Sequence, residues 1–173
     1  VVNLAVALAR LGHDVIVVDA DLDGANLHTV LGVGNPATSL ADFIAYREKD
    51  LAKLVLDTAI PRLRFIAATH ANLASAQPGH FQRVRFLKDL RKLRADVILL
   101  DLGAGMQPAL MDYFLAADDG VIVMTPEPTS IENAYGFLRA AFYRCIRSAV
   151  SSETIRTLVT DAMDQRNDLG IRS

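Results

Sequence analysis

The sequence predicts a doubly wound α/β fold, built on a mainly parallel sheet with helices on both faces. Two β-branched runs, residues 15–18 and 97–100, are apolar at every position. Strands of that kind lie inside a parallel sheet that helices cover on both sides. Amphipathic helical patterns alternate with these runs along the chain, which is the order that a doubly wound fold requires.

Composition fits one globular domain and excludes several other classes of protein. The chain has 173 residues, of which 51% are hydrophobic, and a formal net charge of −2. The apolar content excludes a disordered chain, and the near-neutral charge argues against a protein whose main work is coating nucleic acid. A single cysteine, Cys145, excludes a disulfide scaffold. The apolar runs are far shorter than the ~20 residues of a membrane span.

Strand and helix signals alternate through the first half of the chain. Apolar residues at helical spacing predict a helix over 3–11, and a glycine follows as its stop. A strand over 14–19 comes next and ends in a carboxylate. Ser39 and Asp42 have the spacing of a capping box, which predicts a helix through residue 46. The other elements expected here are a short helix within 21–31 and short strands over 54–56 and 63–66.

The second half of the chain continues this alternation. Val84, Leu87 and Leu90 fall on one stripe of a helix predicted over 81–93. The apolar strand over 97–100 then delivers Asp101 at its end. The remaining elements expected are helices over 108–117, 130–147 and 151–164 and a strand over 120–124.

The strongest local signal follows the first strand, where Asp19, Asp21 and Asp23 stand within five residues. Carboxylates so close together at a strand end repel one another unless a cation or a bound group compensates their charge. One interpretation is therefore a site that holds Mg²⁺ and orients a water molecule. The other is a solvated acidic turn, because Asp and Gly favour turns for backbone reasons. The motif alone does not decide between the two.

A second signal follows the apolar run 97–100, where Asp101 leads into a loop that contains Gly103 and Gly105. P-loop NTPases hold Mg²⁺ beside the nucleotide with an Asp placed in this way. The two glycines would let backbone N–H groups approach a phosphate closely. Many α/β strands end in similar turns, so this pattern by itself is weak.

A third signal is the proline-containing segment that runs from residue 123 through Pro126 into a helix. Taken alone, the segment predicts a rigid loop before a helix whose N-cap is Thr129 or Ser130. Its position after the two acidic segments matters because the order of the three segments forms a joint pattern.

Together and in this order, the three segments resemble the MinD/ParA family of deviant P-loop ATPases. The subgroup resembled most is the MinD-like proteins that include FlhG, a regulator of flagellar number. Residues 2–13 look like the helix that follows the family's phosphate loop, 19–27 like its second acidic motif and 101–105 like its Walker B segment. Residues 126–130 resemble the loop before the next helix. The resemblance covers roughly residues 1–147, and the joint pattern is much more specific than any part.

The resemblance implies an ATPase that works with ATP and Mg²⁺. In the family's pattern, Asp101 holds Mg²⁺ through water, Asp19 supports the metal and the phosphate end, and Asp21 orients the attacking water. The further residues expected at the nucleotide are Gly103, Gly105 and Pro126. The family resemblance also implies an ATP-dependent homodimer that binds a protein partner and positions a flagellum, a division site or a chromosome.

Two parts of the family's pattern are missing from this sequence. The glycine-rich phosphate loop with its lysines is expected just before Val1, and the chain opens without Met. The strand whose Asn helps to read adenine is expected after residue 147, where a polar helix and tail follow instead. We therefore expect 1–147 to be a partial ATPase domain with 148–173 appended, and the chain to be inactive by itself.

Two other functions stay open on the sequence alone. A non-catalytic scaffold would keep the fold and bind partners, and its full-length form would lack the phosphate loop. A biosynthetic or metal-cluster-carrier ATPase of the same superfamily would carry paired cysteines, whereas this chain has Cys145 alone. The four histidines have no zinc-ligand spacing, so a zinc site is not expected.

Charge and hydropathy bear on partners and location. The basic residues of one predicted helix favour a solvated face over a DNA-binding surface, given the near-neutral total charge. They are Arg83, Arg85, Lys88, Arg91, Lys92 and Arg94. We expect a cytoplasmic protein that does not bind DNA. Peripheral contact with the inner face of a membrane would use residues outside this chain.

Overall fold

The computed structural model describes residues 1–22, 24–34, 36–68 and 78–163. The chain forms two compact units, unit 1 (Val1–Ala104) and unit 2 (Gly105–Ser173). Of the helices in the described ranges, none has the length and hydropathy needed to cross a membrane. The division of the chain near residue 147 stays a prediction.

Unit 1 is built on a mostly parallel sheet of four strands in the order β2-β3-β1-β4. The strands are β1 (Val15–Asp19), β2 (Leu56–Asp57), β3 (Leu63–Ile66) and β4 (Val97–Asp101). Strand β1 pairs in parallel with both β3 and β4, and the short β2 is antiparallel to β3. In the register of β1 and β4, Asp19 lies opposite Asp101. The two acidic strand ends are therefore neighbours.

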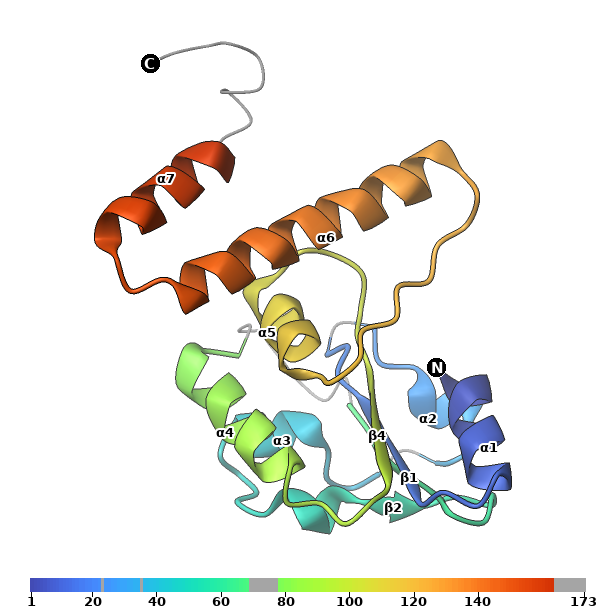
Figure 1. Ribbon diagram of the computed structural model, residues 1–173. Helices are drawn as coiled ribbons and strands as arrows, with labels where there is room; N and C mark the ends of the chain where they lie inside the picture. The colour runs from blue at the N-terminus through green and yellow to red at the C-terminus, as the bar shows by residue number, and fades with distance from the viewer. Residues whose placement is uncertain (23, 35, 69–77, 164–173) are drawn as a thin grey trace. The chain divides into compact units, whose positions relative to one another are not determined.

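Helices cover both faces of this sheet, which confirms the predicted fold class. They are α1 (Val2–Arg10), α2 (Leu27–Val30), α3 (Leu40–Ile44), the 3₁₀ helix η1 (Leu51–Leu54) and α4 (His80–Leu90). Figure 1 shows α1 and α2 on one side of the sheet and α3 and α4 on the other. Ala5 and Ala9 of α1 belong to one buried cluster with Val15 and Val17 of β1. All five residues of β1 are buried, as expected of a central strand.

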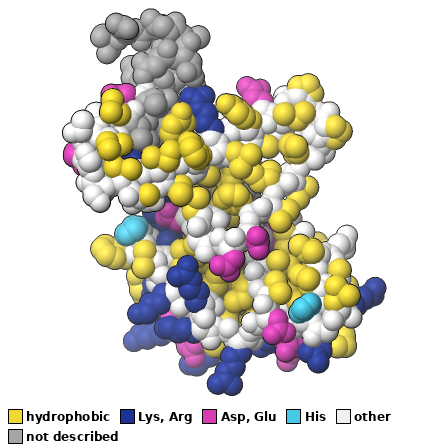
Figure 2. All heavy atoms as spheres, in the orientation of Figure 1, with side chains coloured by type: hydrophobic (Ala, Val, Ile, Leu, Met, Phe, Trp, Pro, Cys, Tyr) yellow, Lys and Arg dark blue, Asp and Glu magenta, His cyan; other side chains and the backbone are white. Residues whose placement is uncertain are grey.

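Arg85 ties α4 to the end of α3. Its guanidinium lies over the rings of Phe43 and Tyr46, at 3.9 and 4.8 Å from the ring centroids. It also donates to the carbonyl oxygens of Phe43 and Lys49, each at 3.0 Å. The basic residues expected on one solvated helix face therefore differ in role: Arg85 is part of the packing, and Lys88 is exposed. Figure 2 shows Lys and Arg side chains gathered over unit 1.

Unit 2 contains three helices in its described residues, α5 (Pro108–Ala116), α6 (Pro128–Ala149) and α7 (Glu153–Met163). The rings of Phe114 on α5 and Phe137 on α6 meet edge to face, with centroids 5.0 Å apart. Asp112 and Arg144 join the same two helices through an ion pair of 2.6 Å. Helix α6 begins two residues before the predicted start, because Pro128 occupies its first turn.

Two predicted strands are wrong in whole or in part. Residues 120–124 form no strand, and the side chains of Val121 and Val123 are 74% and 89% exposed. A strand needs a hydrogen-bonded neighbour, and the described part of unit 2 holds only helices. The strand predicted over 54–56 begins only at Leu56. The preceding residues turn into η1, because the Asp50 carboxylate accepts a hydrogen bond from the Ala52 N–H at 3.0 Å.

Candidate functional site

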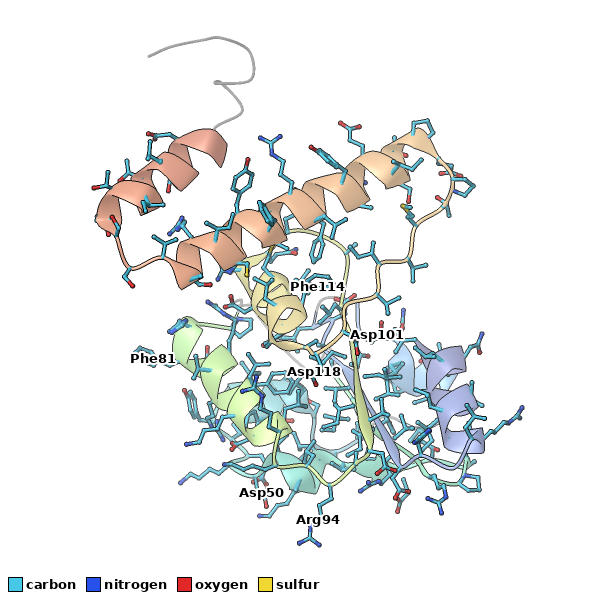
Figure 3. The ribbon with its side chains drawn as sticks, viewed as in Figure 1. Asp50, Phe81, Arg94, Asp101, Phe114 and Asp118 are labelled. Atoms are coloured by element: carbon cyan, nitrogen blue, oxygen red, sulfur yellow. The ribbon has the colours of Figure 1, made fainter. Side chains whose placement is uncertain are left out.

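Three carboxylates gather at the carboxyl edge of the sheet in unit 1. Asp19 and Asp101 end the adjacent parallel strands β1 and β4, and Figure 3 labels Asp101 at the end of its strand. The ladder continues past β1, because the Ala20 N–H donates to the Asp101 carbonyl at 2.9 Å. Asp21 follows directly in the loop after β1. Ligands of open α/β sheets bind at this edge, so these residues mark the candidate site.

Asp19 fixes the loop that connects β1 to α2. Its side chain is buried, and its residue is only 2% exposed. One carboxylate oxygen accepts the Asp21 N–H at 3.3 Å, and the other accepts the Leu27 N–H at 3.1 Å. Because Leu27 is the first residue of α2, Asp19 holds both ends of the loop that carries Asp21.

Burial makes the ionised form of this acidic group costly. Burial is the main cause that raises the pKa of Asp19, and the charges of Asp101 and Asp21 raise it further. Hydrogen bonds from the Leu27 and Asp21 amides offset part of this rise. The pKa of Asp101 is raised as well, first by burial and then by the nearby Asp21. A bound cation would relieve the same repulsion.

The N-terminus of α1 lies beside Asp101. Val1, immediately before the helix, lies close enough to Asp101 for a positive charge at that position to lower the pKa of the Asp101 carboxyl. The first backbone N–H groups of a helix have no acceptor within the helix and attract anions. Carboxylates for a cation and N–H groups for an anion thus occur at one edge of unit 1. This combination fits a phosphate group that arrives with a metal ion.

Asp21 lies in contact with the loop after β4. A Cβ atom added to Gly103 would lie 2.7 Å from the Asp21 Cγ. On the other side, the Gly24 N–H donates to Asp21 Oδ1 at 2.8 Å, and a Cβ on Gly24 would lie 2.6 Å from Asp21 Oδ2. The sequence assigned Gly103 to the approach of a phosphate, yet the Asp21 carboxylate fills the space beside it. Gly24 was not among the predicted site residues.

The remaining predicted site residues lie in unit 2 or outside the described ranges. Gly105 has φ +120°, and the side chain of Gln107 leaves no space for a Cβ on it. Pro126 lies in the exposed segment before α6. The nucleotide contacts assigned to Gly105 and Pro126 stay predictions. Asp23, the third carboxylate of the acidic motif, lies outside the described residues.

The donor set suits Mg²⁺ with phosphate better than a metal held by protein alone. Within the described ranges, no three His, Cys, Asp or Glu side chains are arranged to hold a metal ion together. Mg²⁺ usually keeps several waters and binds one or two carboxylates together with the oxygens of substrate phosphates. Asp101 and Asp19 are therefore residues that could hold Mg²⁺ only beside such a ligand.

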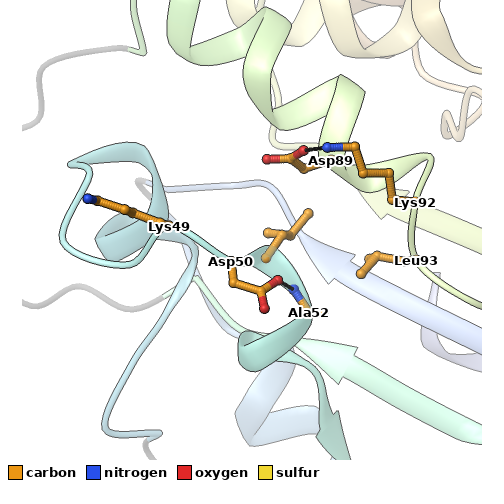
Figure 4. Close-up of a pocket in the computed structure, with 7 residues that line it drawn as sticks. Lys49, Asp50, Ala52, Asp89, Lys92 and Leu93 are labelled. Carbon is orange, nitrogen blue, oxygen red and sulfur yellow. Dashed lines mark hydrogen bonds and ion pairs between the residues drawn. The ribbon is translucent and has the colours of Figure 1, made fainter.

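A small pocket elsewhere in unit 1 is a weaker candidate. Residues just before and within η1, and residues at and just after the end of α4, line it; its charged lining residues are Lys49, Asp50, Asp89 and Lys92 (Figure 4). Three of its four charged side chains already have partners, because Asp89 pairs with Lys92 and Asp50 accepts the Ala52 N–H. The pocket also lies near the start of β4, whereas Asp101 lies at the end of that strand. Its lining contains two aspartates and no residue of α1.

Comparisons with known proteins identify relatives of this chain. No protein-family model matches the chain. The antiactivator FleN of Pseudomonas aeruginosa is 33% identical over 139 residues, which are 80% of this chain and 49% of FleN. The septum site-determining protein MinD of Synechocystis is 31% identical over 133 residues, or 76% of this chain and 49% of MinD.

A solved structure of MinD is also similar to this chain. The septum site-determining protein MinD from Pyrococcus horikoshii, complexed with Mg-ADP, superposes with a TM-score of 0.62 and 26% sequence identity. The match covers 79% of this chain and 56% of that one. This chain spans about half the length of the curated relatives it matches. Motif order, sheet topology and these likenesses together establish that the chain belongs to the MinD/ParA family of P-loop NTPases, with FleN and MinD among its relatives.

Proposed function

We propose that the full-length protein is an ATP-dependent molecular switch that binds Mg-ATP at the carboxyl edge of the unit 1 sheet and hydrolyses it. The observation that carries this proposal is the gathering of Asp19, Asp21 and Asp101 beside the N-terminus of α1. The structure of MinD complexed with Mg-ADP supports the proposal that this chain also binds an adenine nucleotide together with Mg²⁺. Hydrolysis converts ATP and water to ADP and phosphate.

Each carboxylate has a distinct part in the proposed reaction. Mg²⁺, when bound, neutralises charge that develops on the phosphates. Asp101 holds that ion through water, and Asp19 supports the site by fixing the loop between β1 and α2. Asp21 orients the water that attacks the γ-phosphate. Positioning and electrostatics carry phosphoryl transfer, so these acids need no covalent role.

The switch follows from contacts that exist only while the γ-phosphate is bound. Such contacts stabilise one conformation, and hydrolysis removes them. We propose that the ATP form is a homodimer that binds a protein partner and positions a flagellum, a division site or a chromosome. The relatives support a role of this kind, because one is an antiactivator and the other determines a septum site. We propose the cytoplasm as its location, with any contact to the inner membrane face made by residues outside this chain.

The test is to measure Mg-ATP binding and phosphate release by the full-length protein and two variants. Asp101→Ala should weaken Mg²⁺-dependent binding of ATP, because it removes a carboxylate that would hold Mg²⁺ beside the phosphates. Asp57→Ala is the matched control, since Asp57 is an exposed carboxylate on β2, at the far edge of the same sheet. A wild-type protein that neither binds nor hydrolyses Mg-ATP would contradict the proposal and favour a non-catalytic scaffold.

A further inference from the structure

We propose that Gly24 and Gly103 are positioning residues that hold the Asp21 carboxylate in the orientation required for hydrolysis. This inference rests on the proposed function and assigns a new role to two glycines on either side of one side chain. Both glycines lie in unit 1, as does Asp21.

The Asp21 carboxylate occupies the space that a Cβ atom on either glycine would need. A Cβ on Gly103 would lie 2.7 Å from Asp21 Cγ and 2.8 Å from Asp21 Oδ1. A Cβ on Gly24 would lie 2.6 Å from Asp21 Oδ2 and 3.2 Å from Asp21 Cγ. Non-bonded heavy atoms have their best separation at about 3.5–4 Å, so either methyl group would force the carboxylate to move.

Space, and not backbone conformation, requires glycine at these two positions. Neither Gly24 nor Gly103 has φ in the left-handed region, so alanine could adopt both backbones. Gly12 and Gly32 are the opposite case, because their φ values are +99° and +67° and a Cβ on either would meet nothing within 4 Å.

The carboxylate is the part of Asp21 that would give way. The backbone around it is held, because Asp19 accepts hydrogen bonds from the Asp21 and Leu27 amides. The Gly24 N–H also holds Asp21 Oδ1 at 2.8 Å, and alanine at position 24 would keep this donor while adding the clash. The expected result is a rotated carboxylate on an unchanged loop.

A rotated Asp21 should slow hydrolysis without weakening ATP binding. A misplacement of about 1 Å can cost about 10²-fold in rate. In the full-length protein, we therefore expect Gly103→Ala to lower kcat by about 10- to 100-fold with KM for ATP within about twofold of wild type. Gly24→Ala should behave in the same way. Gly34→Ala is the control, since a Cβ there meets nothing within 4 Å and its φ is ordinary.

The decisive comparison adds Gly103→Ala to an Asp21→Ala background. If Gly103 acts through the carboxylate, the double variant has the same kcat as Asp21→Ala, because the atoms of the clash are gone. Thermal unfolding without nucleotide gives an independent readout: Gly103→Ala should lower Tm by several degrees in the wild-type background and leave Tm unchanged in the Asp21→Ala background.

Two results would overturn the inference. One is a wild-type kcat for both glycine variants. The other is a KM that Gly103→Ala raises equally with and without Asp21, since Gly103 would then contact the nucleotide itself. Failure of the proposed function has a different signature, namely an inactive wild type or an Asp21→Ala variant that hydrolyses ATP at the wild-type rate. An inactive Asp21→Ala beside fully active glycine variants overturns only the positioning role.

Discussion

Asp101 and Asp19 are acids whose surroundings oppose their ionisation. Burial is the largest cause of the raised pKa of each, and neighbouring carboxylates add to it. Asp19 recovers part of this cost through two backbone amides. Buried carboxylates that lie close together lower the stability of the folded chain when they are ionised. Clusters of this kind are typical of sites that bind a ligand of opposite charge. Removing the charge of one of these carboxylates should therefore raise the stability of the fold and weaken the binding of the ligand.

We expect Asp101→Asn to stabilise the protein at pH 7 in the absence of divalent cations. The folded-state pKa of Asp101 is raised from its ordinary value of 3.8, so its contribution to stability is greatest below that pH and is lost as pH rises through the raised value. The Asn side chain does not ionise, so the variant does not lose stability at this position as the pH rises. Calorimetric unfolding at pH 7 should show a Tm above that of wild type.

The pH dependence separates this cause from a simple packing effect. Below pH 3.8 wild-type Asp101 is protonated in both states, so the advantage of Asn should disappear there. In the full-length protein, saturating Mg-ATP should make wild type more stable than Asp101→Asn at pH 7, because only the carboxylate supports the ion. An advantage of equal size at both pH values would show that ionisation of Asp101 is not its source.

The sequence predicts which acids meet at the edge of the sheet, but it does not predict the packing of the glycines around Asp21. Asp19 and Asp101 are identifiable because each ends an apolar strand, and parallel strands bring such ends together. Gly24 gives no such signal, because its requirement for space comes from the side chain of Asp21 and not from its own backbone. The sequence predicts that Gly103 lets a backbone N–H group approach a phosphate, and the structure does not test that role. Contacts across a folded loop cannot be read from spacing alone.

At the scale of elements, Arg85 makes several of the contacts that join α4 to the end of α3. We expect Arg85→Lys to destabilise the full-length protein by about 2 kcal/mol, measured by urea unfolding. Lysine keeps the charge, but it cannot donate in a fork to the carbonyls of Phe43 and Lys49 while stacking on the rings of Phe43 and Tyr46.

Arg91→Lys provides the matched control for this prediction. Arg91 follows α4 directly and is exposed, so the same substitution should change stability by less than about 0.5 kcal/mol. Equal effects of the two substitutions would mean that the contacts of Arg85 do not stabilise the fold beyond those of an exposed arginine.

Elements with strong local signals are predictable, and those that depend on partners are not. The capping box of Ser39 and Asp42 is present, and the Ser39 N–H donates to the Asp42 carboxylate at 2.9 Å. Strand β1 also matches its apolar run. By contrast, residues 120–124 have the composition of a strand, but the described residues of unit 2 contain no strand that could pair with them. A strand is a property of a pair, so composition alone predicts it in the wrong place.

At the scale of the whole molecule, the proposed switch predicts a nucleotide-dependent assembly. We expect the full-length Asp21→Asn variant to shift from monomer to dimer when Mg-ATP is added and to remain dimeric, because it binds ATP without consuming it. Mg-ADP should leave it monomeric, since the γ-phosphate contacts are missing. Analytical ultracentrifugation measures both states. A mass that is the same with ATP, with ADP and without nucleotide would contradict the switch.

The most direct test of the account is steady-state ATP hydrolysis by the full-length Asp21→Asn variant, with ATP affinity measured by calorimetry on the same sample. Asn keeps the size of the side chain and its hydrogen bond from the Gly24 N–H, so the acidic turn survives the change. The account predicts a loss of ~10²–10⁴-fold in turnover with wild-type affinity for Mg-ATP. Turnover within a few-fold of wild type would show that Asp21 only shapes the turn and would contradict a site built to orient the attacking water.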